Sequence, residues 1–333
     1  MKLTIARAPL RISFVGGGTD YPEFFEYSQS AGCVVGASIN QYVYVSCLNQ
    51  PPFEEVKFRF TYRKTEAVQK ISEITHPVLR TVLEQRDWDK PLNLATMASL
   101  PGRSGLGSSS AFTVAMVLLM NKLQNRSQNP LEVAMEAIGI ERDTLKEAGG
   151  YQDQLHSSIG GFRMYQFRPT GITVSEQIGY PEVMSELSNS VVLVATGKGR
   201  NSSDFARHAA RRMGNARTLE LGELLSNLAK ETYKQLLTQS DSNLMLSVLA
   251  SAMNEGWELK KRISGHNSGE VDDLIKKGMQ HGAISGKLCG AGGSGFALFL
   301  VPVEQLPGFK KHFNHDDLIF PKLTSEGASI VEF

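Results

Sequence analysis

The segment at residues 101–111, PGRSGLGSSSA, places glycines directly before three consecutive serines. The mostly apolar stretch at residues 112–123 follows it and predicts a buried helix. The first N–H groups of a helix have no partner within the helix, and together with the helix dipole they attract anions. The segment therefore predicts a phosphate-binding loop, with amides and hydroxyls supplied by Gly105, Leu106, Gly107, Ser108, Ser109 and Ser110. It is not a Walker A loop, because that motif needs a lysine where Ser108 stands.

Two further glycine clusters flank this loop in the sequence, at residues 15–21 (VGGGTDY) and 287–296 (KLCGAGGSGF). A dinucleotide-binding fingerprint at the first cluster would need glycine where Tyr21 stands, so that class of site is excluded. The cluster predicts instead a turn that follows a strand and presents Thr19 and Asp20. The other cluster has more glycines than a tight turn needs, which predicts backbone that closely approaches a ligand or another loop.

The elements that must position these clusters change in type along the chain. The first hundred residues are mostly strand-like, with two short strands expected on either side of Pro9 and others at residues 34–39 and 42–48. Helical patterns dominate after residue 190, between strand-like segments. A length of 333 residues fits about two domains. We therefore expect an α+β protein with domains at residues 1–190 and 191–333.

Composition excludes several classes of function. Lys and Arg number 35 against 34 Asp and Glu, so the chain has no basic field typical of proteins that bind nucleic acid or a membrane surface. The three cysteines form no CxxC pair, which favours a reducing compartment. The longest apolar runs fall short of the roughly 20 residues that a membrane span needs. These observations predict a soluble cytoplasmic protein.

The three glycine motifs resemble those of the GHMP kinases, named for galactokinase, homoserine kinase, mevalonate kinase and phosphomevalonate kinase. They occur in the family's order between residues 7 and 296, and GLGSSSA at residues 105–111 is highly specific. The N-terminal RAPLRISFVGGGTDYPEFF is most similar to the sugar-kinase branch, which includes the fucose kinases. The resemblance implies a fold of two α/β domains with the active site in the cleft between them, where the third cluster packs against the phosphate loop. It also implies ATP as phosphate donor and Mg²⁺ as cofactor.

The resemblance assigns roles to residues of this chain. Asp153 in GGYQDQLHSSIGG matches the family's catalytic aspartate, and Arg11 matches its basic partner. The acidic metal ligand of the family lies about a dozen residues before that aspartate, so Glu141 is the candidate, with Asp143 and Glu147 as alternatives. Ser108 or, as we favour, Ser109 would be the hydroxyl ligand of Mg²⁺. The ATP phosphates would contact Gly102, Arg103, Ser104, Gly105, Leu106, Gly107, Ser108, Ser109, Ser110 and Gly292.

The acceptor would be a sugar or sugar phosphate, phosphorylated at a hydroxyl that we expect to be the anomeric one. Gly17, Gly18, Thr19 and Asp20 would contact its hydroxyls, and Arg200, in a basic turn with Lys198, would bind an acceptor phosphate. D-glycero-D-manno-heptose 7-phosphate is the first candidate. Alternatives are fucose or another hexose, an acceptor such as mevalonate or homoserine, and a regulator that binds nucleotide without catalysis. A homodimer is one expectation for the oligomeric state.

Overall fold

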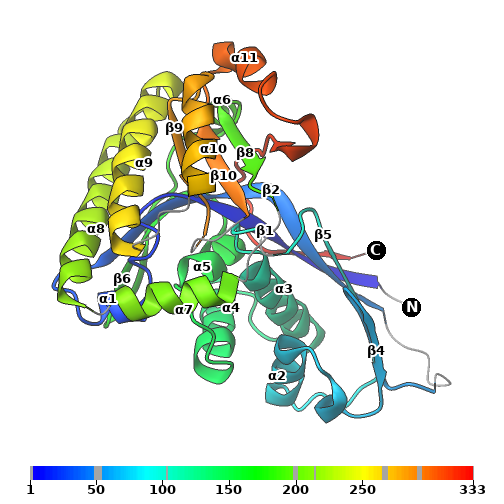
Figure 1. Cartoon of the computed structure of the whole chain (residues 1–333). Coiled ribbons are helices and arrows are strands. Elements are labelled where there is room, and N and C mark those ends of the chain that lie inside the picture. Colours follow the sequence, from blue (N-terminus) through cyan, green and yellow to red (C-terminus); the bar gives the residue numbers. More distant parts are fainter. Residues whose placement is uncertain are drawn as a thin grey trace.

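The computed structural model describes residues 3–48, 55–102, 104–197, 202–213, 215–264, 269–290 and 295–332. Within these residues the chain forms two sheets with helices packed around them (Figure 1). The larger sheet has the strand order β12-β1-β2-β5-β3-β4, with β6 pairing β2 and β7 pairing β6. The smaller has the order β11-β8-β10-β9. The predicted α+β class is confirmed.

Two long strands form the centre of the larger sheet. β1 (Leu3–Val15) and β2 (Gly32–Leu48) are antiparallel and paired along most of their length. The expectation of short strands separated at Pro9 is wrong, because β1 continues through the proline with a shift of register between Pro9 and Leu10. A bulge of this kind tolerates a residue that has no N–H to donate.

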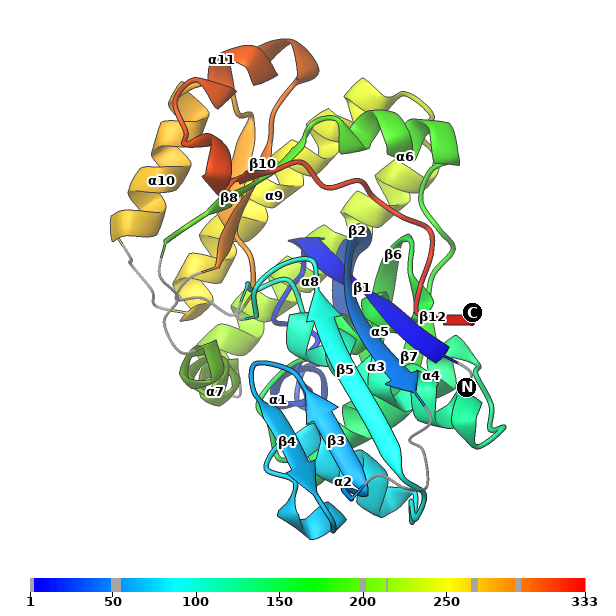
Figure 2. The same cartoon turned by 90° about the vertical axis from the view of Figure 1, so that its right-hand side faces the viewer.

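The remaining strands extend the larger sheet on both sides. β5 (Leu92–Ala98) pairs with β2, and the hairpin of β3 (Phe58–Thr61) and β4 (Thr65–Val68) continues from β5. At the other end of β2 lies the hairpin of β6 (Phe162–Arg168) and β7 (Gly171–Val174). Figure 2 shows this sheet below the smaller one.

Helices from the first half of the chain cover one face of the larger sheet. α3 (Ser108–Leu123) and α5 (Gln152–Ile159) both pack on β1 and β2. Between them come α4 (Pro130–Ile138), which begins at the predicted cap Asn129, and one π-helical turn, η2 (Gly139–Thr144). The short helices of this region are α1 (Pro22–Phe25), η1 (Ile71–Glu73) and α2 (Pro77–Gln85).

The second half of the chain builds the smaller sheet and the helices beside it. Its strands are β8 (Val191–Ala195), β9 (Ser285–Leu288), β10 (Phe296–Leu300) and β11 (Leu318–Ile319). The helices are α6 (Pro181–Ser188), α7 (Ser202–Met213), α8 (Ala216–Leu237), α9 (Ser242–Ser264), α10 (Gly269–Gln280), η3 (Val303–Gln305), α11 (Leu306–Lys310) and η4 (His315–Asp317). Within the described residues, no helix is long and apolar enough to cross a membrane.

The two halves share one main hydrophobic core. It runs from Ile12 and Phe14 of β1 through Met253 of α9 to Leu193 and Leu298 of the smaller sheet. α8 packs on β2 and α9 packs on β1, so helices of the second half also contact the larger sheet. The last strand, β12 (Ser329–Glu332), returns to pair with β1. The domain boundary at residue 190 stays a prediction. β12 does not follow it, because this strand lies in the second predicted domain but pairs with β1 of the larger sheet.

Candidate active site

A cavity of about 580 Å³ lies where β1, the N-terminus of α3, η2, α5 and α9 meet. Predicted site residues that are far apart in the sequence line it together. From the first part of the chain these are Arg11, Gly17, Gly18 and Asp20; from the middle they are Gly105, Gly107, Ser108, Ser109, Ser110, Glu141 and Asp153. The fold therefore brings residues predicted for catalysis, nucleotide binding and acceptor binding to one cavity.

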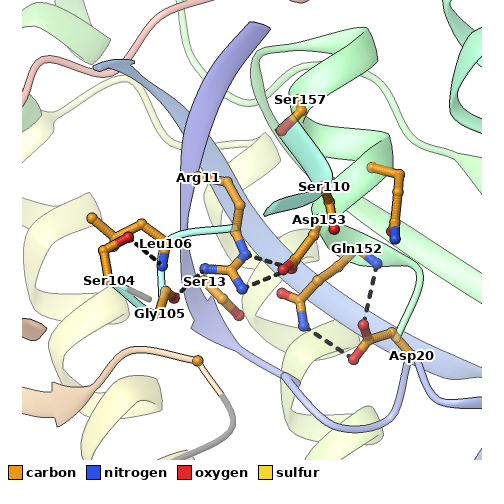
Figure 3. A network of polar contacts seen from close by, with 12 residues as sticks. Arg11, Ser13, Asp20, Ser104, Gly105, Leu106, Ser110, Gln152, Asp153 and Ser157 are labelled. Atoms are coloured by element: carbon orange, nitrogen blue, oxygen red, sulfur yellow. Dashed lines mark hydrogen bonds and ion pairs between the residues drawn. The ribbon is translucent and has the colours of Figure 1, made fainter. Parts of the chain in front are cut away.

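Arg11 and Asp153 form the ion pair that the sequence predicts across 142 positions (Figure 3). Arg11 Nε and Nη2 lie 2.8 and 2.7 Å from the same carboxylate oxygen, Oδ1 of Asp153. Arg11 is 4% exposed, and its Nη1 donates to the carbonyl of Gly105 at 2.7 Å. Within the described part of the chain, Oδ2 of Asp153 has no hydrogen-bond donor. Asp153 lines the cavity, so this oxygen is a candidate to accept a proton from a hydroxyl bound there.

The predicted phosphate loop leads into α3 as expected. Gly107 stands at the N-cap of α3 with a φ of 77°, and no side chain caps the helix. A Cβ on Gly107 would lie 3.3 Å from the Asp153 carboxyl carbon, so glycine is needed both for the backbone and for the approach of the aspartate. The N-terminus of α3 faces the cavity through Ser108 and Ser109.

Some residues of the loop do not have the predicted phosphate-facing position. Leu106 is fully buried; its N–H donates to Ser104 Oγ at 3.4 Å and its carbonyl accepts from Arg11 N at 3.0 Å (Figure 3). The amide of Leu106 is thus used inside the loop, and Ser104, at 3% exposure, serves to hold it. Gly102 does not line the cavity. Arg103 and Gly292 lie outside the described residues.

The third glycine cluster packs against this loop, as predicted. A Cβ on Gly290 would lie 2.9 Å from the Cα of Gly105, and one on Gly295 would lie 2.3 Å from the carbonyl oxygen of Ser104. Both positions have positive φ, so two backbones meet there without side chains between them. Gly290 also lines the cavity.

Glu141 lies on the π-helical turn η2 and is 5% exposed. Its carboxylate accepts hydrogen bonds from Ser110 Oγ at 2.9 Å and from Gln154 Nε2 and Thr113 Oγ1, both at 2.5 Å. Burial raises the pKa of Glu141 to about 7, although these hydrogen bonds oppose the rise. The alternatives Asp143 and Glu147 are exposed. The hydroxyl beside the carboxylate belongs to Ser110, whereas the predicted ligand Ser109 lines the cavity one residue earlier.

The environment of Glu141 fits a hard cation such as Mg²⁺, which binds oxygen ligands. Within the described residues its carboxylate has only neutral hydrogen-bond donors and no ion pair. The same residues contain no cluster of three or more His, Cys, Asp or Glu side chains. A cation here would therefore be held by Glu141, a serine hydroxyl and phosphate oxygens, and it remains a prediction.

The turn after β1 carries the predicted acceptor contacts, but its polar side chains hold the protein together. Asp20 is 1% exposed and accepts from Gly18 N at 2.9 Å, Gln152 N at 3.1 Å and Gln152 Nε2 at 3.0 Å (Figure 3). Burial raises the pKa of Asp20. The carboxylate thereby fixes the start of α5, the helix that carries Asp153, to the turn.

Thr19 is not placed to contact an acceptor, which corrects the prediction. It is fully buried, and its Oγ1 lies 2.9 Å from the carbonyl oxygens of Gly16 and Cys33, one of which accepts its proton, and itself accepts from Cys33 N at 3.0 Å. A hydroxyl that links Gly16 of the turn to Cys33 of β2 stabilises the turn instead. Gly17 and Gly18 do line the cavity.

Sequence comparison identifies the family at this point. The model of the GHMP kinases N terminal domain matches residues 71–161, and the model of the GHMP kinases C terminal domain matches residues 244–319. Together the two matches cover half of the chain. The chain belongs to the GHMP kinase family. It is accordingly a kinase, an enzyme that transfers phosphate to a hydroxyl.

Individual GHMP kinases resemble the chain over nearly its whole length. It is 28% identical to a D-glycero-alpha-D-manno-heptose 7-phosphate kinase of Campylobacter jejuni over 90% of each chain. It is 25% identical to a galactokinase of Pyrococcus furiosus, over 91% of this chain and 90% of the relative. Among solved structures, a D-glycero-D-manno-heptose 1-phosphate kinase from Bacteroides thetaiotaomicron superposes with a TM-score of 0.78 over 98% of both chains, at 22% identity. That likeness shows the fold.

Two lysines of this GHMP kinase site were not predicted. Lys287 of β9 is 5% exposed, and its Nζ donates to the carbonyls of Ser13 and Phe14 at 2.8 and 3.1 Å. Burial lowers the pKa of its ammonium to about 7. Lys260 of α9 lines the cavity and donates to the Gly290 carbonyl at 2.7 Å. Lys287 begins the third glycine motif and could have been found there, whereas nothing in the sequence singles out Lys260.

The predicted anion site at Arg200 lies outside the described residues, as does Lys198. The helix that follows, α7, contributes the exposed Arg207 to the lining of the cavity. Arg142 and Lys146, near η2, also line it. The cavity thus has basic residues at its edge in addition to those beside Asp153.

Proposed function

We propose that this GHMP kinase uses ATP to phosphorylate a sugar phosphate at its anomeric hydroxyl, with D-glycero-D-manno-heptose 7-phosphate as the first candidate. The observation that carries the proposal is the ion pair of the buried Arg11 with the half-buried Asp153, which lies between the phosphate loop and the glycine turn in one cavity. The relative named for D-glycero-alpha-D-manno-heptose 7-phosphate, 28% identical over 90% of this chain, supports the choice of acceptor.

The geometry supports separate roles for the N-terminus of α3, Asp153 and Arg11 in phosphoryl transfer. Transfer requires that the γ-phosphate and the acceptor oxygen be held in line and that the spread negative charge be neutralised. The N-terminus of α3 would bind the ATP phosphates, and Asp153 Oδ2 would accept the proton of the attacking hydroxyl. Arg11 holds the carboxylate in place through Oδ1.

Mg²⁺ would be held by Glu141 together with a serine at the start of α3. When bound, it would neutralise charge on the ATP phosphates. Ser108 and Ser109 line the cavity, and the hydroxyl of Ser110 lies 2.9 Å from Glu141. The buried carboxylate and the helix N-terminus stand on the same side of the cavity, so a cation and a phosphate would be bound as neighbours.

A coupled assay of ADP release over hexoses, heptoses and their terminal phosphates tests the proposal. The wild type should turn over the heptose 7-phosphate, and Asp153→Asn should lower kcat by a factor of about 10² to 10⁴, as for loss of a general base. Asp143→Asn, at an exposed carboxylate on the neighbouring turn, is the matched control and should leave kcat unchanged. No turnover on any sugar, or equal activity of wild type and Asp153→Asn, would overturn the proposal.

The acceptor's own phosphate needs a cation away from the transfer point. Arg200 is the residue that the sequence proposes, and Arg207 on α7 is the described arginine of that region that lines the cavity. Arg207→Ala should raise the KM for the phosphorylated acceptor more than for the unphosphorylated sugar, and so should Arg200→Ala. Arg211→Ala, exposed on the same helix and away from the cavity lining, should change neither. Equal effects on both acceptors would remove these residues from the phosphate site.

Unphosphorylated fucose or another hexose is the second candidate acceptor. The chain is 24% identical to the bifunctional fucokinase/GDP-fucose pyrophosphorylase of Arabidopsis thaliana over 89% of its own length and 30% of that protein. Galactose itself is disfavoured, because Gly17 and Gly18 stand where the resemblance places an acidic residue and a histidine in galactokinase. A kcat/KM for the free hexose above that for the heptose 7-phosphate would establish this candidate.

A further inference from the structure

Lys260 lies in the cavity between the phosphate loop at residues 101–111 and the glycine turn at residues 15–21. Its ammonium donates to the carbonyl of Gly290, whose backbone packs on Gly105 of the phosphate loop. On the other side, a Cβ on Gly17 of the glycine turn would lie 3.9 Å from Lys260 Nζ. Lys260 is thus linked to the phosphate loop through Gly290 and lies beside Gly17, which places its ammonium between the sites expected for the ATP phosphates and for the acceptor.

The other basic groups nearest Lys260 already have fixed partners. Arg11 is bound to the Asp153 carboxylate and the Gly105 carbonyl. Lys287 is bound to two carbonyls of β1 behind the cavity. Farther away, Arg142 is paired with Glu23 at 2.8 Å.

Lys260 differs from these groups because, within the described residues, its only bound partner is one neutral carbonyl. Within the described residues its single hydrogen bond is to the neutral Gly290 carbonyl, and no carboxylate lies within ion-pair distance. An ammonium has three N–H donors, so two remain for a ligand in the cavity. A positive charge held in place by one carbonyl and lacking a carboxylate partner matches an anionic ligand.

We propose that Lys260 is a further catalytic residue, which binds the equatorial oxygens of the phosphoryl group while it is transferred. The inference rests on the proposed kinase function and adds to it the cation that neutralises the transition state. The charge on these oxygens must be offset by a cation that does not need to move during the reaction. The hydrogen bond to Gly290 supplies that fixed position.

The step balances without a covalent role for the lysine. The acceptor hydroxyl oxygen forms a bond to the γ-phosphorus, and the bond from that phosphorus to the β,γ-bridging oxygen breaks. Its electron pair leaves with ADP, and the hydroxyl proton goes to Asp153 Oδ2. Lys260 stays protonated throughout and only donates hydrogen bonds.

Three substitutions of Lys260 distinguish the effect of its positive charge from the effect of its hydrogen bond to Gly290. Lys260→Gln keeps an N–H donor that can reach toward Gly290 but removes the charge, Lys260→Met removes both, and Lys260→Arg keeps both. Lys261→Gln is the matched control, because Lys261 is the next residue of α9 and its ammonium pairs with Glu258 at 2.6 Å. All four proteins are compared with wild type in kcat, in KM and in thermal unfolding.

The proposal predicts that Gln and Met lower kcat alike, by about 100-fold or more, with KM for both substrates changed less than about threefold. Lys260→Arg should recover part of the activity, and Lys261→Gln should be unaffected. If Lys260 only supports the glycine cluster, Gln would behave like wild type and Met alone would be impaired and less stable. That pattern, or full activity of both variants, would overturn the proposal.

A binding measurement gives a second readout. MgADP, aluminium fluoride and the heptose 7-phosphate together imitate the planar phosphoryl group in transfer. Lys260→Gln should weaken this assembly by about the same factor as kcat, while its affinity for MgADP alone stays within about threefold of wild type. Equal losses for MgADP and for the assembly would place Lys260 in ground-state nucleotide binding and overturn the proposal.

The outcome for Lys260 can be told apart from the outcome for the proposed function. If the wild type phosphorylates no sugar, the proposed function fails, and the role of Lys260, which rests on it, is overturned with it. If wild type is active and Asp153→Asn is not, the proposed function stands, and only the comparison of Lys260→Gln with wild type decides the role of the lysine.

Discussion

Replacement of Glu141 by glutamine should stabilise the protein at alkaline pH in the absence of ligands. Glu141 is almost fully buried among the neutral donors Ser110, Thr113 and Gln154, and burial raises its pKa to about 7. Ser110 and Gln154 donate to Oε2 of Glu141 and Thr113 donates to Oε1, so a glutamine whose amide oxygen stands at the Oε1 position still accepts from Thr113. Its new NH₂ group can donate to Oε1 of Gln154, a buried atom that has no donor among the described residues. The substitution therefore removes the charge, and the network re-forms with Ser110 Oγ and the turned amide of Gln154 as acceptors of the new NH₂ group.

The sign and size of the effect follow from the difference in pKa between the folded and unfolded chains. Below a pH of about 4.5, the ordinary pKa, the carboxyl is protonated in both states and contributes no penalty. As the pH rises from 4.5 to 7, the unfolded chain loses the proton first, so the folded state is progressively destabilised. Above pH 7 the penalty is constant, at about 3 kcal/mol for a difference of about 2.5 pKa units.

Urea denaturation of both proteins between pH 5 and pH 8.5 measures this penalty. The unfolding free energy of Glu141→Gln minus that of wild type should grow with pH and level off above pH 7. Other titrating groups, including Lys287 with its pKa of about 7, are present in both proteins and cancel in the difference. Glu84→Gln, at an exposed carboxylate on α2, is the control for loss of one negative charge.

A flat difference across this pH range would refute the reasoning, because it would mean that Glu141 is not desolvated in the folded state. Addition of Mg²⁺ with ADP extends the test. If the carboxylate holds the cation, these ligands should stabilise wild type at pH 8 more than the glutamine variant. Equal stabilisation of both would remove Glu141 from the metal site.

Three other substitutions test how the site is assembled. Gly150→Ala would place a Cβ 1.8 Å from Asp20 Oδ2 and should cost about 2 kcal/mol or more of unfolding free energy, measured in urea; Gly149→Ala, with no atom within 4 Å of its Cβ, is its control, and equal stabilities would contradict the predicted clash. Gly290→Ala, at a φ of +74°, should raise the KM for ATP more than that for the acceptor, because its Cβ would press on the phosphate loop; the reverse ratio would count against that packing. Thr19→Val should lower the unfolding free energy by about 1 to 3 kcal/mol with the acceptor KM unchanged. A raised KM at unchanged stability would restore Thr19 as a substrate contact.

The parts of the site that could be predicted from the sequence are those that depend on backbone geometry. Gly107 and Gly290 require positive φ and close approach, which only glycine permits freely, so their function is visible in the residue type. The roles of Arg11 and Asp153 are predicted only through the resemblance to the GHMP kinases, because neither residue type nor spacing alone singles them out. The class of the fold followed from the change of pattern along the chain.

Other parts depend on which way a side chain points, and that is decided by tertiary packing. Thr19 and Asp20 are neighbours in a polar turn, yet the Thr19 hydroxyl turns inward to backbone groups and the Asp20 carboxylate turns to the start of α5. Lys260 lies in a helix of ordinary amphipathic pattern, and only the packing of α9 on β1 brings it to the cavity. Pro9 suggests a break that the bulge in β1 avoids.

Glu141 and Lys260 present the same physical problem with opposite signs. Glu141 is buried and Lys260 is half-buried, and within the described residues neither has a partner of opposite charge, so each charge is partly desolvated without compensation in the folded chain. They lie on different parts of the cavity wall and do not form an ion pair with each other. A phosphate bound together with a cation would supply an opposite charge to each residue. The cation would pair with Glu141, and the phosphate oxygens would pair with Lys260. On the proposed function, these two charges are kept apart so that the nucleotide, its metal and the transferred phosphate complete them.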